Sequence, residues 1–323
     1  MSLSAEERYY IKLKASYLHY IEGKTQSELA KLFNVSRPTL IKLLNDAREE
    51  GIVKIEINDV QGGACFIEKE QELCKRLDLK DVKIIRAVNN DQESINTSIG
   101  MAAAQYFARL LIPGMTVGIA WGNTLQLMVN YQQPDNKVER LQFVPLLGGL
   151  SSPSSEGYSM FANSLCEQIA SKYSKSVVNM LYAPLYVQDR EMAETYRNSA
   201  EISKIFDKMA HLDVAVVGID SDLPHSTTIQ FEKNLQQDFN KLQKEGMVGN
   251  ICANFYDING KSSKSGIEHN IIAITPENLQ KTPLVIGAAG GEYKVASIIG
   301  GARAKFYNVL ITDEITAGRI LDK

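Results

Sequence analysis

Short apolar segments alternate with amphipathic helical segments over most of this 323-residue chain, and this alternation limits its fold more than any other feature. The apolar segments carry hydrophobic residues at nearly every position, as strands do in a sheet covered on both faces. Alternating strands and helices of this kind predict βαβ units and a parallel, Rossmann-like sheet of the α/β class. The predicted strands are residues 82–87, 116–120, 141–145, 177–182, 214–219, 271–275, 284–288 and 309–311. The predicted helices are residues 94–111, 123–131, 158–173, 191–209, 231–245, 293–302 and 314–321.

Composition excludes several other classes of protein. The hydrophobic fraction of 44% and the charged fraction of 23% are ordinary for a soluble globular chain and argue against disorder or a coiled coil. No apolar run approaches the roughly 20 residues of a membrane helix, and no apolar signal region follows the polar start of the chain. These features predict a cytoplasmic protein. The four cysteines lie far apart without a CxxC pair, so we expect buried reduced thiols rather than a zinc site.

The first fifty residues have a different pattern, typical of three short helices. Residues 5–22 predict an amphipathic helix that ends at Gly23. Thr25 and Glu28 have the spacing of a capping box for a second helix, and Asn34 suits the turn that follows it. The apolar residues of the first helix that we expect to pack inward are Tyr10, Leu13, Tyr17, Leu18 and Ile21.

A third helix is predicted from Ser36, its N-cap, to about Glu50, where Gly51 ends it. Residues 52–57 alternate between apolar and charged side chains and predict a strand, so the expected unit is winged-helix-like. The apolar positions of the second and third helices match two helices that cross in a helix-turn-helix. These positions are Leu29, Ala30, Val35, Leu40 and Leu43.

The third helix has the side chains of a DNA-recognition helix, whose N-terminal end enters the major groove. Arg37, Thr39 and Lys42 would meet base edges or phosphates, while Gln26 and Ser36 would hold the DNA backbone. The sequence therefore predicts binding of double-stranded operator DNA. The alternative is a small three-helix cap whose charged face is merely solvated.

Charge is distributed unevenly along the chain. The net charge is −3, but residues 1–54 hold nine Lys and Arg against seven acidic residues, so this head carries +2. One head with so small a charge should hold DNA weakly. Two heads on a two-fold operator would supply more phosphate contacts, which predicts a homo-oligomer, either a dimer or a tetramer.

Four predicted strands end in loops that suit an anionic ligand. Glycine lets backbone amides approach a ligand, helix N-termini favour negative charge, and ligands of open α/β sheets collect at the carboxyl ends of strands. Neither the GxxxxGK[ST] nor the GxGxxG pattern occurs, which disfavours ATP and NAD. A phosphorylated small molecule is the predicted ligand. The loops are residues 117–124, 145–152, 216–221 and 286–291, with Lys294 just beyond the last.

Other residues have simpler interpretations. The four histidines are scattered without metal-ligand spacing, so no metal site and no cofactor is expected. Trp121 is expected in the core rather than stacked on a sugar, and residues 257–260 form a hairpin turn rather than a calcium loop. Asp313 is expected to cap a helix rather than to act in catalysis.

The segments NVSRPTLIKLL, GIAWGNTL, VPLLGGLS, DVAVVGID and VIGAAGGEYKVASIIGG, in this order, resemble the SorC (SorC/DeoR) family of bacterial sugar-responsive regulators. The resemblance covers essentially the whole chain. It implies a helix-turn-helix domain at residues 1–57, a hinge at 58–63 and a sugar-phosphate effector-binding and oligomerisation domain at 64–323. The effector domain would resemble sugar-phosphate isomerases and deaminases. Family members are commonly tetramers or dimers of dimers.

Carried onto this sequence, the family pattern gives ten candidates for effector binding. Lys294 and Thr124 would hold a phosphate, and Asp220 would meet sugar hydroxyls. Where relatives often read AVGD, this chain has Asn250, and residues 144–155 contain no cation. We therefore expect a non-covalent, singly phosphorylated sugar. The candidates are Gly122, Asn123, Thr124, Gly148, Gly149, Ser151, Asp220, Gly290, Gly291 and Lys294.

These features favour a DNA-binding transcriptional regulator of carbohydrate metabolism, controlled by a sugar phosphate and without enzymatic activity. The alternative is a sugar-phosphate isomerase or deaminase with an accessory helical domain. An enzyme needs a placed acid and base near the ligand, and Asp220 is the single obvious candidate, so no catalytic residue is assigned. A scaffold that binds neither DNA nor sugar is a third, weaker hypothesis.

Overall fold

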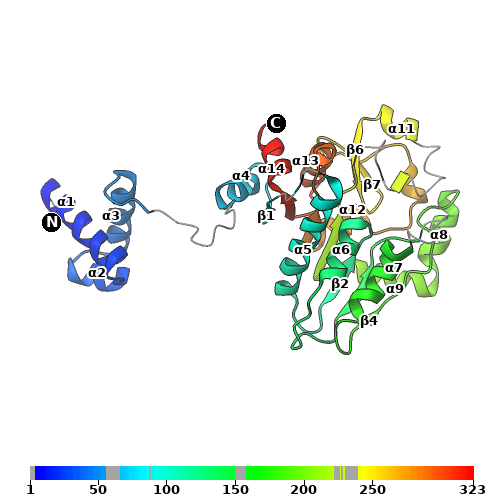
Figure 1. The fold of residues 1–323 in the computed structure, drawn as a ribbon, viewed down its shortest axis with the longest axis horizontal. Helices are drawn as coiled ribbons and strands as arrows, with labels where there is room; N and C mark the ends of the chain where they lie inside the picture. Colours follow the sequence, from blue (N-terminus) through cyan, green and yellow to red (C-terminus); the bar gives the residue numbers. More distant parts are fainter. Residues whose placement is uncertain are drawn as a thin grey trace. The chain divides into compact units, whose positions relative to one another are not determined.

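A computed structural model describes residues 4–55, 66–86, 89, 91–149, 158–221, 226, 228–229 and 239–323. Its contacts divide the chain into two compact units, Met1–Gly63 and Ala64–Lys323, which we call the head and the body (Figure 1). The predicted hinge at 58–63 lies outside the described residues, as do Ser151 and Cys65. No helix in the described ranges is long and apolar enough to span a bilayer.

The head contains the three predicted helices with their predicted caps. Thr25 Oγ1 accepts from the Glu28 N–H at 3.3 Å, and the Glu28 carboxylate accepts from the Thr25 N–H at 2.8 Å. Asn34 adopts φ 54°, and Ser36 Oγ accepts from the Thr39 N–H at 3.2 Å. These contacts confirm the capping and turn predictions. The elements are α1 (Ala5–Ser16), the π-helical turn η1 (Tyr17–Ile21), α2 (Gln26–Leu32) and α3 (Arg37–Glu49).

The predicted contacts between α2 and α3 are confirmed, because Leu29, Ala30, Leu40 and Leu43 are buried and Val35 packs against them. The predicted inward face of the first helix is wrong. Its buried apolar residues are Ile11, Ala15 and Leu18. Small Ala15 lets α1 approach α3 closely, which a face of tyrosines would prevent. Of the predicted face, only Leu18 is buried, and the exposed residues are Tyr10, Leu13, Tyr17 and Ile21.

The predicted strand after α3 is also wrong over residues 52–55, which have no strand structure. The Val53 N–H instead donates to the Ala47 carbonyl at 3.0 Å, which closes the turn after α3. Within the described part of the head there is no second strand to pair with this segment. Alternation of apolar and charged side chains could therefore not by itself produce a strand, because the backbone groups would lack ladder partners. Residues 56–57 lie outside the described ranges.

The body is built on one seven-stranded sheet in which every pair is parallel, with spatial order β1-β9-β8-β5-β2-β3-β4. This confirms the α/β, Rossmann-like prediction. The central strand β5 is buried at four successive positions, Val214 to Val217, as expected for a sheet covered on both faces. The strands are β1 (Asp81–Ile85), β2 (Thr116–Ile119), β3 (Gln142–Pro145), β4 (Val177–Val178), β5 (Val214–Gly218), β8 (Leu284–Ala288) and β9 (Val309–Asp313).

Most of the helices follow the predicted segments. Helix α4 was not predicted, and the predicted helix 191–209 divides at Ser199 into α8 and α9. Helices α5, α6 and α7 pack side by side (Figure 1). The α-helices are α4 (Ile67–Leu77), α5 (Gln92–Leu110), α6 (Asn123–Tyr131), α7 (Ala162–Ala170), α8 (Arg190–Asn198), α9 (Ala200–Met209), α11 (Phe239–Lys244), α12 (Pro276–Lys281), α13 (Val295–Arg303) and α14 (Glu314–Leu321). Short 3₁₀ turns are η2 (Tyr158–Met160), η5 (Ile267–Asn270) and η6 (Glu292–Lys294).

One predicted strand is absent, and a separate hairpin is present that was not predicted. Residues 271–274 are buried, but the segment forms only isolated pairings, at Ile271 and Ala273. An antiparallel hairpin of β6 (Met247–Ile251) and β7 (Asn254–Asp257) was not predicted, and its turn places Cys252 and Ala253 at positive φ. The predicted turn after it is confirmed, because the Gly260 N–H donates to the Asp257 carbonyl at 2.9 Å.

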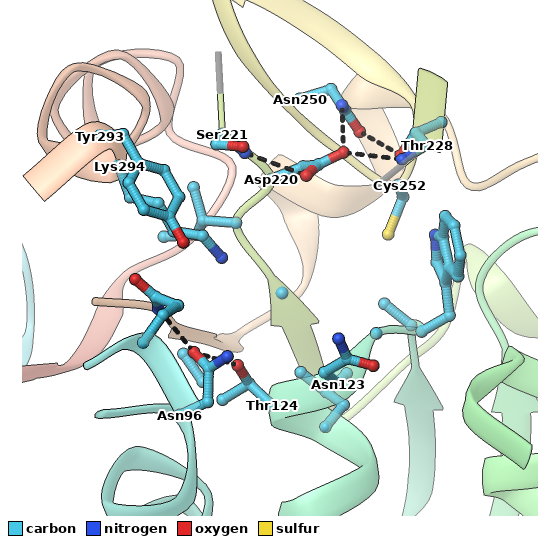
Figure 2. A pocket seen from close by; sticks show the side chains of 18 residues that line it. Asn96, Asn123, Thr124, Asp220, Ser221, Thr228, Asn250, Cys252, Tyr293 and Lys294 are labelled. Carbon is cyan, nitrogen blue, oxygen red and sulfur yellow. Dashed lines mark hydrogen bonds between the residues drawn. The ribbon is translucent and has the colours of Figure 1, made fainter. Parts of the chain in front are cut away.

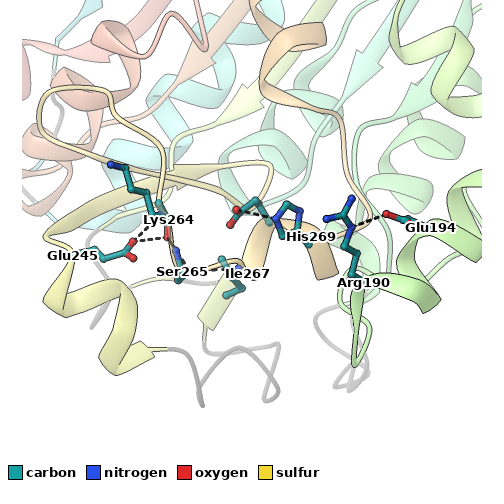
Figure 3. A network of polar contacts seen from close by, with 9 residues as sticks. Arg190, Glu194, Glu245, Lys264, Ser265, Ile267 and His269 are labelled. Carbon is teal, nitrogen blue, oxygen red and sulfur yellow. Dashed lines mark hydrogen bonds and ion pairs between the residues drawn. The ribbon is translucent and has the colours of Figure 1, made fainter.

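A polar network holds the segment between this hairpin and η5 (Figure 3). The Glu245 carboxylate accepts from Ser263 Oγ at 2.6 Å and from the Lys264 N–H at 3.0 Å. On the neighbouring α8, Arg190 pairs with Glu194 at 2.7 Å. The contacts of Glu245 hold the segment beyond β7 against the end of α11.

The prediction of buried reduced thiols is confirmed for two of the three described cysteines. Cys166 and Cys252 are free and buried, and Cys74 is free and partly buried.

Candidate functional site

The strand order locates the site. From β2 the chain proceeds to β3 and β4 on one side, whereas β5, β8 and β9 lie on the other side. Strands β2 and β5 are neighbours, with Val117 opposite Val214 and Ile119 opposite Val216. The connections therefore change direction between these two strands, and open α/β sheets bind ligands at the carboxyl ends of strands at such a point.

A cavity of about 180 Å³ lies at this place (Figure 2). The residues after β2 and after β5 line it, together with side chains from α5, η6 and the β6–β7 hairpin. The residues discussed below are Gln92, Asn96, Trp121, Gly122, Asn123, Thr124, Asp220, Ser221, Thr228, Asn250, Cys252, Tyr293 and Lys294, all of which line it.

The N-terminus of α6 opens into this cavity. Gly122 precedes the helix at φ 124°, a conformation that side chains rarely tolerate. The first helical hydrogen bond is from the Gln126 N–H to the Gly122 carbonyl. The N–H groups of Asn123, Thr124 and Leu125 therefore have no partner within the helix. Together with the helix dipole, they favour a bound anion.

Two side chains from the start of α5, Gln92 and Asn96, line the cavity, and Figure 2 shows Asn96 beside Thr124. Asn96 Oδ1 accepts from Gln92 Nε2 at 2.9 Å and from Thr124 Oγ1 at 3.4 Å. Gln92 Nε2 also donates to the Gly290 carbonyl at 3.0 Å. These bonds fix the orientation of the Asn96 amide, whose Nδ2 donors have no acceptor among the described residues. Asn96 can therefore donate to a ligand.

Asp220 organises the opposite wall. Its Oδ2 accepts from Ser226 Oγ at 2.6 Å, from the Thr228 N–H at 3.1 Å and from Asn250 Nδ2 at 3.1 Å. Its Oδ1 accepts from the Ser221 N–H at 3.0 Å. Asn250 replaces the carboxylate that the family pattern often has, and here its amide donates to Asp220. A second carboxylate at this distance would repel Asp220 instead.

Lys294 supplies the positive charge. It lies at the end of η6, partly buried, and its ammonium group points into the cavity (Figure 2). Burial lowers the pKa of Lys294, and the negative charge of Asp220 opposes this lowering. An anion bound beside Lys294 would favour its charged form further. The cavity thus combines one ammonium group, one helix N-terminus and a ring of amide and hydroxyl groups.

The structure brings five of the ten effector candidates together: Gly122, Asn123, Thr124, Asp220 and Lys294. Gly148 and Gly149 line a second cavity, of about 240 Å³, beside α7.

Gly290 and Gly291 are not among the residues that line the first cavity, but the Gly290 carbonyl accepts from Gln92, which does line it. A Cβ at Gly290 would overlap the Asp313 carboxylate, and the Gly291 N–H donates to Thr316 Oγ1 at 2.8 Å. Asp313 caps α14 as predicted, accepting from the N–H groups of Ile315 and Thr316. These two glycines thus support the cavity through the start of α14.

Sequence reasoning did not select Gln92, Asn96 or Thr228 as cavity residues, and it considered Asn250 only as a lost carboxylate. Gln92 and Asn96 begin the helix after β1, so the rule that placed the other loops could have included them. Trp121, expected in the core, is only partly buried and lines the cavity, with its ring against Phe161 at a centroid distance of 6.0 Å.

The candidate DNA-binding surface lies on the head. Arg37 and Lys42 are exposed on α3, and Thr39 and Gln26 are partly exposed. The Ser36 hydroxyl caps α3 and lies 2.7 Å from Thr39 Oγ1. Both cations can therefore reach a partner, whereas Ser36 already has a structural role.

Comparison with known proteins identifies the class. Residues 64–322 match the family described as "Putative sugar-binding domain". The full-length sorbitol operon regulator SorC from Klebsiella pneumoniae is 26% identical, with a TM-score of 0.72 covering 98% of this chain and 100% of that one. The transcriptional regulator LsrR of Enterobacter sp. (strain 638) is 26% identical over 99% of this chain and 94% of its own. The deoxyribonucleoside regulator of Bacillus subtilis (strain 168) is 26% identical over 98% of both chains.

These similarities, together with a helical head and a parallel α/β body, place the chain in the class of effector-controlled transcriptional regulators. Because the family model matches most of the chain, this protein belongs to the SorC family of sugar-binding transcriptional regulators. The matched family is thus the one that the sequence resembles.

Proposed function

We propose that this regulator binds a singly phosphorylated sugar non-covalently in the cavity between β2 and β5, and that the bound sugar changes its affinity for operator DNA. The observation that carries the proposal is that Lys294 and the open N-terminus of α6 line one cavity. A phosphate satisfies both groups at once, because it brings negative charge and several acceptor oxygens.

The remaining polar groups suit the sugar. The amides of Asn96 and Asn123 can donate to hydroxyl or ring oxygens. The wall around Asp220 offers carboxylate and hydroxyl oxygens that accept from sugar hydroxyls. In this proposal the Thr124 contribution is its backbone N–H, since its hydroxyl donates to Asn96.

The same geometry disfavours the enzyme alternative. Among the described lining residues Asp220 is the only carboxylate, and there is no histidine. Three donors already bind Asp220 Oδ2, so proton transfer at that oxygen would break bonds that shape the wall. We therefore propose a non-catalytic protein without a cofactor. Its partners are operator DNA, contacted by Arg37, Thr39 and Lys42 with Gln26 and Ser36 at the edge, and further copies of the chain.

A thermal-shift screen of the full chain against phosphorylated sugars and their unphosphorylated counterparts tests this proposal. A ligand at 100 times its dissociation constant stabilises the native state by about 2.7 kcal/mol. We expect stabilisation by at least one phosphorylated sugar and none by its counterpart. Lys294→Met should remove the response, whereas Lys281→Met, on the exposed face of α12, should retain it. An unchanged response in Lys294→Met would refute the site, and turnover of the sugar would support the enzyme alternative.

A further inference from the structure

Helix α14 connects the effector cavity to the helix at which the chain enters the body. It packs against η6, the 3₁₀ turn that carries Lys294, and also against α4. Helix α4 begins at Ile67 and is the first helix after the predicted hinge at 58–63 among the described residues. Figure 1 shows α14 beside α4. One short helix therefore contacts both the cavity wall and the entry of the body.

The contact between η6 and α14 is a buried chain of hydrogen bonds. The Gly291 N–H, immediately before η6, donates to Thr316 Oγ1 at 2.8 Å, and this hydroxyl donates to Asp313 Oδ2 at 2.6 Å. Asp313 and Thr316 are 0% and 1% exposed. Water cannot replace a bond that breaks there, so the pairing is costly to lose. The position of η6, and with it that of Lys294, is therefore tied to the position of α14.

An ion pair on the surface joins the same two elements. Arg319, one turn beyond Thr316 on α14, pairs with Glu292, the first residue of η6. Their side chains are 41% and 73% exposed, so the pair adds little to stability. It lies two residues from Lys294 along the chain. The pair is therefore a place where the contact can be altered without disturbing the core.

The other end of α14 is bound by α4. Arg76 Nη1 donates to the carbonyl oxygen of Leu321, the last residue of α14, at 2.6 Å. The last four carbonyls of a helix have no acceptor role inside it, so this one is available to α4. Arg76 lies in the last turn of α4 and lines neither the effector cavity nor any part of the head. Its substitution therefore leaves both proposed binding sites intact.

Helix α4 has room to move. It packs on β1, which is an edge strand of the sheet. A cavity of about 290 Å³ lies beside it, lined by Leu77 of α4, Ile299 of α13 and Ile320 of α14. The Glu70 carboxylate accepts from the Ile84 N–H at 2.9 Å and anchors α4 to β1. A displacement at the last turn of α4 therefore tilts the helix about this anchor.

We propose that α14 transmits occupancy of the effector cavity to α4, with Thr316, Arg319 and Arg76 as positioning residues. The proposal rests on the proposed function, in which a sugar phosphate in the cavity changes operator affinity. A phosphate on Lys294 fixes the position of η6. Thr316 and Arg319 then set the position of α14, and Arg76 sets that of α4. Because coupling is a free energy shared by two sites, a break at Arg76 uncouples them and removes neither.

Hydrogen–deuterium exchange of the full chain tests the connection with inorganic phosphate as the probe and potassium chloride of equal ionic strength as the control. In wild type, phosphate should slow exchange about threefold or more in η6, α14 and α4. In Arg76→Gln it should slow exchange in η6 and α14 only. Lys75→Gln, exposed beside Arg76 on α4, should behave as wild type.

Operator binding separates coupling from stability. The assay uses the phosphorylated sugar with the largest thermal shift and a duplex that wild type selects from a random library. The sugar should change the operator affinity of wild type about tenfold or more, and that of Arg76→Gln less than about twofold, with both separate affinities retained within about threefold. A merely structural Arg76 would lower stability and leave this response unchanged. Glu292→Arg and Arg319→Glu should each weaken the response, and the two together should restore it.

The outcomes distinguish this proposal from the proposed function. Slower exchange in η6 with unchanged α4 in wild type would overturn the connection and leave the effector site standing. No change in η6 with phosphate or any sugar phosphate would refute the effector site, and the connection is then decided without a ligand. Thr316→Val should speed exchange in α4 about threefold or more, and Thr316→Ser should not. Glu292→Arg, an exposed change that the fold tolerates, should also speed it. Unchanged α4 exchange in Thr316→Val and Glu292→Arg overturns the proposal.

Discussion

A single methyl group added at Gly290 would test how the loop after β8 packs against Asp313 and α5 beside the cavity between β2 and β5. A Cβ at this position would overlap the Asp313 carboxylate and would lie 2.6 Å from Ile99 Cδ1. Asp313 is fully buried and cannot simply turn outward. Its Oδ1 accepts from the Thr316 N–H at 2.9 Å, and its Oδ2 accepts from Thr316 Oγ1 at 2.6 Å. Thr316 in turn holds the Gly291 N–H.

The magnitude follows from these contacts. Carbon atoms in packed cores lie about 3.5–4.0 Å apart, so the loop or α5 must shift by about 1 Å. Overpacking of this kind costs about 1–3 kcal/mol, and a disturbed N-cap costs about 1 kcal/mol more. We therefore expect Gly290→Ala to lower the free energy of unfolding by about 2–4 kcal/mol. Gly318→Ala is the matched control, because nothing lies within 4 Å of its Cβ inside α14. It should stabilise the body by about 0.5–1 kcal/mol.

Urea unfolding followed by tryptophan fluorescence measures this change in the body alone, since the chain has one tryptophan, Trp121, beside the cavity. If the free energy of unfolding of Gly290→Ala were within 0.5 kcal/mol of wild type, the loop could accommodate a methyl group without displacing Asp313 or Ile99. The packing argument would then be wrong. If Gly318→Ala were equally destabilising, any methyl group near α14 would have this effect, and the argument from Asp313 would fail.

Three further predictions concern the head and the cavity. Arg37→Ala should weaken operator binding by about 1–3 kcal/mol in a gel-shift assay. Arg48→Ala, at the far end of α3, should weaken it less. Equal losses in the two variants would show that the recognition surface is assigned to the wrong part of α3. Asn34→Ala should destabilise the head by about 1 kcal/mol and Asn34→Gly should not, because Asn34 is left-handed; hydrogen exchange of head amides measures both. Burial lowers the pKa of Lys294, so the folded state holds fewer protons and stability should rise with pH from that lowered pKa up to about 10.4. Sugar-phosphate affinity should fall over the same range, and Lys294→Met should show neither trend.

Local rules predicted those elements whose ends are fixed by local chemistry. Helix α6 begins and ends as expected, because Gly122 can adopt the positive φ that precedes it. Ser36 and Asn34 likewise fix the start of α3. Residues 271–275 show the opposite case. Their apolar side chains require burial, but isolated bridges to Leu147 and Tyr186 hold the segment without a regular strand. Periodicity reports burial and cannot report which neighbour supplies the hydrogen bonds.

The site was predictable in the same uneven way. Asn123, Thr124, Asp220 and Lys294 meet because each follows a parallel strand, and the carboxyl ends of parallel strands share one edge. Asn250 reaches the cavity from an antiparallel hairpin whose turn, at Cys252 and Ala253, lacks the usual turn residues. The first helix was misjudged because it has two apolar faces. Only tertiary packing against α3 decides that Ala15 lies inside.

The small positive charge of each head determines how much free energy the effector must supply to change operator affinity. With +2 over residues 1–54, one head has little electrostatic affinity, so most operator affinity should come from joining two heads. Joining can raise affinity by about 10²–10⁴ without new contacts, and a geometry that forbids simultaneous binding removes all of it. By linkage, the sugar phosphate must then prefer one arrangement by the same factor. A factor of 10² corresponds to about 2.7 kcal/mol. Charge-assisted hydrogen bonds contribute about 1.5–3 kcal/mol each, so one phosphate held by Lys294 and the start of α6 can supply this difference if only one arrangement lets both groups reach it.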